Sequence, residues 1–174
     1  MAGLPEEHWS RKVTELAKNF VIKPLGPGKV LQAYPLVQSA VPHLTLEQWR
    51  EYVRSVYDGK TGPIGRAGVM SAENRDGYIY GLYCHVVEPD IHHGRVLKVR
   101  NFVAANLYDS AGIIDRLMDS IVSVARDNGC TAVHVDLPDR ARHGPEPVES
   151  VVSMFKGAGF RVESVAMCRA IEES

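Results

Sequence analysis

The residues around Gly112 occupy a position where a protein can bind an anion. The sequence predicts a strand at residues 95–106, a tight turn, and a long helix from about Ser110 to Asn128. The first turn of a helix has backbone N–H groups without partners in the helix, and the helix dipole adds partial positive charge there. A phosphate-bearing ligand is therefore one interpretation of this segment. The other is purely structural, because most strand-turn-helix units bind nothing.

Two polar side chains, His134 and Asp136, alternate along a predicted strand at residues 131–137. Alternate residues of a strand lie on the same face of a sheet, so these two are expected to lie together. An imidazole in this position can take a proton from a substrate, which makes His134 a candidate catalytic base. A histidine satisfied in the core or at a sheet edge is the structural alternative.

A second group of residues that can bind a metal lies in the middle of the chain. Its members are Cys84, His85, Glu88, Asp90, His92 and His93. Structural zinc sites use paired ligands separated by short, fixed gaps that recur along the sequence, and this group has no such repeat. The sequence therefore predicts a polar hairpin loop here and no metal site.

Composition restricts the class of protein. The 174 residues, of which 45% are hydrophobic, can form one complete core. The formal net charge of −1 gives no broad positive surface, so we expect no nucleic acid partner and only local phosphate binding. No apolar run is long enough to span a membrane, and the polar N-terminus differs from a secretory signal, so we expect a cytoplasmic protein. The three cysteines are expected to fill core space without forming disulfides.

The N-terminal part is predicted to be helical and separate from the main body. Residues 6–20 place apolar side chains three and four positions apart, as an amphipathic helix does, and the KPLGPGK segment at 23–29 interrupts this pattern. We therefore expect an N-terminal helical appendage at 1–28 and one domain at 29–174. Within that domain a short apolar run at 30–34 predicts a strand, and Thr45 with Gln48 predicts the capping box of a helix.

Strands dominate the middle of the chain. Residues 64–72 and 78–87 are rich in β-branched and aromatic residues, and the turn between them predicts a hairpin, with a third strand at 95–106. Gly129 is expected to end the following helix, which has the length that a crossover to a parallel strand at 131–137 requires. A helix at 148–156 and a strand at 160–171 complete the prediction. The fold class is α/β (α+β), with a mixed, mostly antiparallel central sheet flanked by helices.

This order of elements, together with three local features, resembles the GNAT superfamily of N-acetyltransferases over residues 30–171. Residues 102–118 look like the family's fourth strand, pyrophosphate loop and third helix. The SMFKGAGF segment at 153–160 is similar to the family's late helix, which ends in a Gly-Phe pair before the sixth strand. The VAMCRAI segment at 165–171 is similar to its terminal strand.

The resemblance implies transfer of an acyl group from acetyl-CoA to an amine of a small molecule or a protein. It implies that the fourth and fifth strands separate to admit the pantetheine arm, which the backbone of Phe102, Val103 and Ala104 would bind. It also implies an acceptor pocket shaped by the loops at 40–45 and 88–94. The segment that would bind the pyrophosphate through its backbone comprises Asp109, Ser110, Ala111, Gly112, Ile113 and Ile114.

Three residues depart from the family's pattern. Asp109 stands where the family usually has Arg or Gln, and Ile114 replaces the second small residue of the loop. Phe155 stands where many relatives have a tyrosine that protonates the departing thiolate. A noncatalytic GNAT-like module that binds a ligand or a partner protein is therefore the alternative function. A third hypothesis is a structural subunit whose N-terminal helix mediates assembly as a homodimer.

Overall fold

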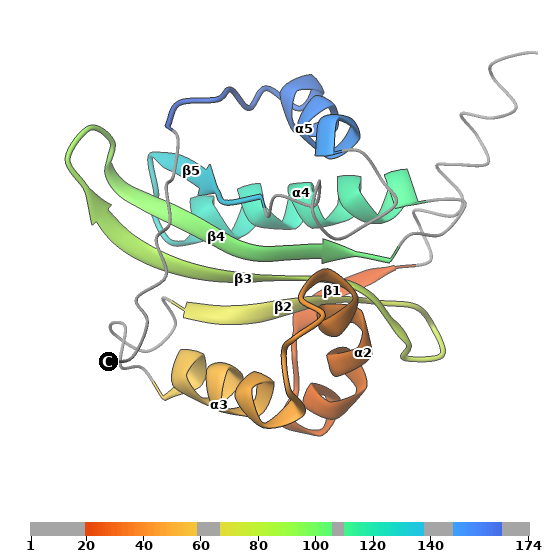
Figure 1. The fold of residues 1–174 in the computed structure, drawn as a ribbon. Coiled ribbons are helices and arrows are strands. Elements are labelled where there is room, and N and C mark those ends of the chain that lie inside the picture. The colour runs from red at the N-terminus through yellow and green to blue at the C-terminus, as the bar shows by residue number, and fades with distance from the viewer. Residues whose placement is uncertain (1–19, 59–66, 106–109, 138–147, 165–174) are drawn as a thin grey trace, which may run out of the picture.

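The computed structural model describes residues 20–58, 67–105, 110–137 and 148–164. Within these ranges a five-stranded sheet separates two layers of helices (Figure 1). No described helix has the length and hydrophobicity needed to cross a membrane. The elements in chain order are β1 (Val21–Pro24), a short 3-10 helix (Pro27–Lys29), α2 (Val30–Ala40), α3 (Leu46–Tyr57), β2 (Ala67–Glu73), β3 (Ile79–Asp90), β4 (Gly94–Ala104), α4 (Ser110–Asp127), β5 (Ala132–Val135) and α5 (Val148–Gly157).

The sheet has the strand order β1-β2-β3-β4-β5, and this confirms the predicted mixed, mostly antiparallel architecture. Each of the first four strands is antiparallel to its neighbours, and β5 lies parallel to β4. The 18-residue helix α4 makes the crossover between β4 and β5. Gly129, with a φ of 63°, follows the end of this helix in the left-handed conformation that the sequence predicts.

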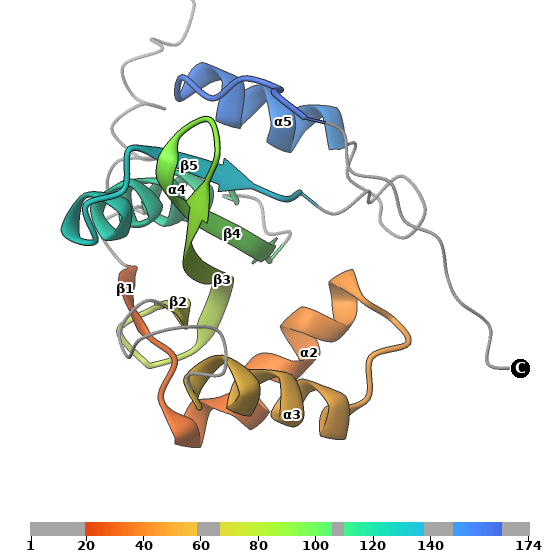
Figure 2. The same cartoon turned by 90° about the vertical axis from the view of Figure 1, so that its left-hand side faces the viewer.

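Helices cover both faces of the sheet (Figure 1 and Figure 2). On one face, α2 and α3 pack around a core that includes Trp49 and Val53. The capping box at the start of α3 is present, because the side chains of Thr45 and Gln48 each bind the backbone of the other residue. On the opposite face α4 packs on the sheet, and Phe155 of α5 joins the same core.

The turn between β3 and β4 is fixed by short polar contacts. Asp90 Oδ1 accepts hydrogen bonds from the backbone N–H groups of His92 and His93, both at 2.9 Å. Thr131 Oγ1, just before β5, donates a hydrogen bond to the carbonyl of His93. Aspartate side chains commonly bind nearby backbone in this way at turns. The turn therefore holds His93 beside the start of β5.

Helix α2 shows that the strand predicted at residues 30–34 is wrong. Its buried residues are Ala33 and Val37, which are four positions apart and so lie on one face of a helix. The local pattern was ambiguous because Pro35, which lies inside this helix, divides the apolar residues into short runs. Packing of Ala33 and Val37 with the core under α3 supports the helix in spite of the proline.

Strand β1 was not predicted. Val21–Pro24 pairs with Met70–Glu73 of β2, and the adjoining Leu25 is 2% exposed. The domain that contains the sheet thus includes residues before 29. Residues 1–19 of the predicted appendage lie outside the described residues.

At the C-terminal end, residues 160–164 have no regular secondary structure where the sequence predicts a strand. The rest of that predicted strand lies outside the described residues.

We expect Gly81→Val to lower the free energy of unfolding by about 1–3 kcal/mol, which is typical of overpacking. A Cβ atom at residue 81 would lie 2.8 Å from Leu117 Cδ1 and 3.0 Å from Ile113 Cγ2, so these side chains or α4 itself would have to shift. Chemical denaturation measures the change. Gly26→Ala is the control, because nothing lies within 4 Å of a Cβ at that position. Equal stability of Gly81→Val and the wild type would contradict this contact between α4 and the sheet.

Candidate active site

Strand β5 pairs with β4 along the whole length of β5, but β4 is the longer strand. Val96–Val99 of β4 pairs with Ala132–Val135 of β5, and the N–H of Asp136 donates to the carbonyl of Val99 at 2.9 Å. Strand β4 continues to Ala104, but no described residue pairs with it beyond Val99 on the β5 side. Beyond this point, called the strand separation below, β4 has no neighbour on the β5 side among the described residues.

A backbone irregularity at Asn101 coincides with the separation. Asn101 has a φ of 52°, in the left-handed region that residues other than glycine seldom adopt. The register between β3 and β4 shifts between Leu82 and Cys84, which lie across from Asn101. A bulge of this kind bends a strand and redirects the side chains that follow it. It lies two residues beyond the last pair with β5, in the part of β4 that is still paired with β3.

The structure places Phe102, Val103 and Ala104 on the part of β4 that has separated from β5. The side chains of Phe102 and Val103 are buried, so what these residues can offer a ligand is their backbone. The Phe102 ring contacts the Phe155 ring edge-on, with 5.2 Å between centroids, and Phe160 lies 5.0 Å from Phe155 on another side. An apolar cluster of three aromatic rings therefore lies beside the separated strands.

Helix α4 begins at Ser110, which agrees with the predicted start. The N–H groups of its first turn, which includes Ala111 and Gly112, have no acceptor within the helix. Ile113 and Ile114 are 1% and 5% exposed and belong to the core against the sheet, so their side chains are directed into the protein. Asp109, the other residue predicted to bind the cofactor, lies outside the described residues.

His134 and Asp136 lie beside two cationic side chains of β4. His134 is paired in register with Lys98. The Asp136 carboxylate lies 3.7 Å from both Lys98 Nζ and Arg100 Nε. All three charged side chains are partly exposed, so these ion pairs contribute little to stability. They make the surface next to the strand separation polar, with two positive charges and one negative charge.

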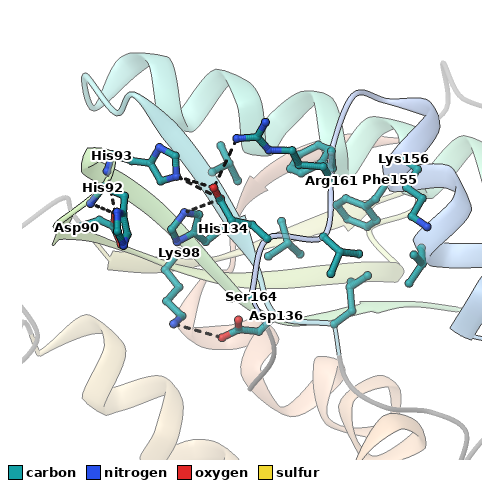
Figure 3. Close-up of a pocket in the computed structure, with 17 residues that line it drawn as sticks. Asp90, His92, His93, Lys98, His134, Asp136, Phe155, Lys156, Arg161 and Ser164 are labelled. Atoms are coloured by element: carbon teal, nitrogen blue, oxygen red, sulfur yellow. Dashed lines mark hydrogen bonds and ion pairs between the residues drawn. The ribbon is translucent and has the colours of Figure 1, made fainter. Parts of the chain in front are cut away.

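A pocket of about 680 Å³ lies over this end of β5 (Figure 3). Its volume is within the range of small-molecule sites. Figure 3 shows His93 and His134 toward one end of the pocket and Phe155 toward the other. The first end is the polar end of the pocket, and the second combines the Phe155 ring with Lys156.

The polar end of the pocket brings together three residues that the sequence does not associate, His93, His134 and Glu163. His93 Nε2 lies 3.1 Å from Glu163 Oε1, and His134 Nε2 lies 3.8 Å from Glu163 Oε2. The hydrogen bond from His93 is the main cause that holds the pKa of Glu163 below its usual value. His93 and Glu163 are 70 residues apart, so no spacing motif could have indicated the contact.

The polar group predicted as a loop at residues 84–93 is divided by the structure. Cys84 and His85 are buried within β3, and the strand continues to Asp90. His92 and His93 lie in the turn that follows. Burial lowers the pKa of His85, so this imidazole is neutral in the core and has no part in the polar end of the pocket.

Tyr52, Cys84 and Asn101 interact on the face of the sheet covered by α3, close to the strand separation. A small cavity of about 100 Å³ adjoins Tyr52, Cys84 and Arg100. Burial raises the pKa of the Tyr52 hydroxyl above its usual value and raises the pKa of the Cys84 thiol to about 11. Both groups therefore stay protonated at neutral pH. The sequence predicts the capped helix that carries Tyr52 but gives no signal for this contact.

Solved structures with the same architecture have low sequence identity to this chain. A glucosamine-6-phosphate N-acetyltransferase from Arabidopsis thaliana matches 88% of this chain and 99% of its own, with a TM-score of 0.65 and 13% identity. An acetyltransferase from Trypanosoma brucei matches 87% and 99%, with a TM-score of 0.66 and 16% identity. An aminoglycoside N-acetyltransferase in complex with CoA matches 87% and 94%, with a TM-score of 0.65 and 12% identity.

Comparisons of sequence alone are negative. No family model matches the sequence, and no curated protein matches it significantly. The structural matches establish the fold: this chain has the GNAT fold that the order of its elements predicted.

Proposed function

We propose that this chain, which has the fold of the GNAT acetyltransferases, is an acyl-CoA-dependent N-acyltransferase. The observation that supports the proposal is the strand separation, where β4 continues beyond its last pair with β5 and α4 is the next helix along the chain. Beyond Val99, no described residue pairs with the β5 side of β4, and such a strand edge can bind the amides of an extended ligand. The first turn of α4 offers N–H groups to a diphosphate. Both features fit the two chemical parts of CoA.

The residues present suit the binding of acetyl-CoA, which would supply a thioester carbonyl for attack by an amine. The backbone of Phe102, Val103 and Ala104 would bind the pantetheine amides and donate to the developing oxyanion. The amides of residues 110–113, together with the predicted contribution of Asp109 and Ile114, would bind the diphosphate. The rings of Phe102, Phe155 and Phe160 would exclude water from the apolar side.

Proton transfer requires two further groups. We assign removal of the ammonium proton to His134, which lies on β5 one residue before its pairing with β4 ends. Phe155 has no proton to donate and is 3% exposed in the aromatic cluster. We assign protonation of the departing sulfur to the Tyr52 hydroxyl. This hydroxyl interacts with Asn101 at the bulge, and burial keeps it protonated.

The acceptor in this proposal is an amine that binds on the face of the sheet covered by α2 and α3. Lys98, Arg100 and Asp136 lie at the strand separation and make this approach polar. Two of the similar structures are named for small acceptors, an amino sugar phosphate and an aminoglycoside. A small polar amine is therefore the first class of acceptor to examine, with a protein amine as the second.

Thiol release from acetyl-CoA in the presence of a panel of amines tests the proposal, with thermal unfolding in the presence of CoA beside it. We expect at least one amine to accelerate thiol release. We also expect CoA to raise the stability by about 2.7 kcal/mol at 100 times its Kd, because it binds the native state alone. Stabilisation without turnover would instead favour the noncatalytic module, which the missing hydroxyl at Phe155 supports. No stabilisation at high CoA concentration would contradict both functions that involve this ligand.

A further inference from the structure

We propose that His93, His134 and Glu163 form a binding site for a divalent transition metal ion, for which Zn²⁺ is the probe. The three residues come from the β3–β4 turn, from β5 and from the segment after α5. The rings of His93 and His134 lie edge to face with 5.3 Å between their centroids (Figure 3). One ligand atom from each lies within 4.8 Å of the other two. The sequence-based expectation of no metal site considered a different group of residues, which shares only His93 with this one.

The donor atoms and their spacing suit zinc. Imidazole nitrogen and carboxylate oxygen are common zinc ligands, and bonds of roughly 2.0–2.2 Å in a tetrahedral arrangement place the ligand atoms roughly 3.3–3.5 Å apart. His93 Nε2 lies 3.1 Å from Glu163 Oε1, and His134 Nε2 lies 3.8 Å from Glu163 Oε2. These two separations bracket the required value, and the ligand atoms of the two imidazoles lie within 4.8 Å of each other. Binding of an ion would therefore require side-chain rotations that bring the three atoms closer together.

The His134 Nε2 atom provides an independent observation. It is buried and has no hydrogen-bond partner among the described residues. Buried polar atoms in folded proteins nearly always have a partner, because leaving one unpaired costs free energy. Glu163 Oε2, at 3.8 Å, is too distant to accept a hydrogen bond. A metal ion between these two atoms would bind the nitrogen and the carboxylate at once.

The three ligands are held to different degrees. The backbone of His93 is fixed on both sides, by Asp90 at its N–H and by Thr131 at its carbonyl. His134 belongs to the paired part of β5. The Glu163 carboxylate also lies 3.5 Å from Arg161, whose side chain is 80% exposed, and such a contact exchanges with water at little cost. With three protein ligands, a fourth position is left for water or a ligand from the adjoining pocket.

Metal binding would also affect acyl transfer. This effect rests on the proposed function, whereas the metal site itself does not. A metal-bound His134 Nε2 has no lone pair with which to take a proton. Zn²⁺ should therefore inhibit turnover by the wild type. His93→Ala removes a ligand but leaves the His134 imidazole in place, so turnover by this variant should be less sensitive to Zn²⁺ by at least about tenfold in inhibitory concentration.

Titration of the metal-stripped full chain with Zn²⁺, in competition with a chromophoric chelator, tests the site. We expect one tightly bound ion per chain. His93→Ala and Glu163→Gln should each weaken the affinity by at least about tenfold, since even outer-sphere partners of a metal site contribute that much. His92→Ala is the matched control, because it removes an imidazole from the same turn that is not one of the three ligands. The side chains of His93 and Glu163 are both partly exposed. Thermal unfolding checks that the variants fold.

Wild-type affinity in either His93→Ala or Glu163→Gln would overturn the site, because the ion would then be bound elsewhere, for example by cysteines. Zn²⁺ should raise the Tm of the wild type but not that of the double variant H93A/E163Q, and equal increases would also overturn it. The binding titration contains no CoA and no amine. Zinc binding with the expected variant pattern therefore supports the site even if no amine is acetylated.

Discussion

Replacement of Ser110 by proline should weaken CoA binding by roughly 10- to 150-fold without removing helix α4. Proline has no backbone N–H and is favoured at the first helical position, which Ser110 occupies. A hydrogen bond from this N–H to a charged phosphate contributes about 1.5–3 kcal/mol, and this corresponds to the expected loss of affinity. Calorimetric titration with CoA measures the change directly.

Ser110→Ala is the matched control for this variant. It removes the hydroxyl but keeps the backbone N–H, so it should bind CoA like the wild type. Pantetheine, which lacks the diphosphate, should bind Ser110→Pro and the wild type equally well. Equal CoA affinity of Ser110→Pro and the wild type would contradict diphosphate binding at the start of α4. An equal loss in both variants would place the effect in the hydroxyl and contradict the backbone interpretation.

The half of the fold that contains the proposed cofactor site could be predicted from sequence because its signals are local. The apolar periodicity of α4, the glycine at residue 129 and the short strand after it indicate a helix between two strands. A helix of this length connects parallel neighbours, so the relation between β4 and β5 follows from steric rules and needs no knowledge of distant contacts. The capping box at Thr45 is likewise contained within four residues.

The N-terminal half was harder to predict because its structure depends on distant partners. Pro24 is the last residue of β1. The end of an edge strand tolerates a proline, although the same residue indicates a loop when only the local pattern is considered. The partner of β1 lies in β2, almost fifty residues further along the chain. Pro35 inside α2 misled in the same way, since burial of Ala33 and Val37 outweighs the local preference.

In the candidate site, too, features within one element could be predicted and contacts between distant elements could not. Strand alternation placed His134 and Asp136 together, and helix periodicity located the first turn of α4, because each rule operates within one element. The contact of Glu163 with His93 and the contact of Tyr52 with Asn101 join elements that are distant in the sequence. The bulge at Asn101 has no sequence signal, because a positive φ at asparagine is permitted but is not required.

His134→Ala should lower kcat by about 10²- to 10⁴-fold, the range typical of the loss of a general base. The KM for acetyl-CoA should change little, because the proposal assigns cofactor binding to β4 and α4 and gives His134 no part in it. A metal chelator in every assay keeps the imidazole of the wild type free for proton transfer. The His134 side chain is 30% exposed, so its removal leaves the core intact, and thermal unfolding checks this.

Rescue of His134→Ala turnover by added imidazole distinguishes a catalytic base from a residue that only supports the site. Imidazole added to His134→Ala can enter the space left by the side chain and take the proton in its place, so turnover should recover in proportion to the free imidazole concentration. His92→Ala, which removes another imidazole that lines the pocket, should keep wild-type kcat. A His134→Ala enzyme with wild-type kcat, or one whose loss no concentration of imidazole reduces, would mean that another group takes the proton. His134 would then contribute only to the polar end of the pocket, together with His93 and Glu163.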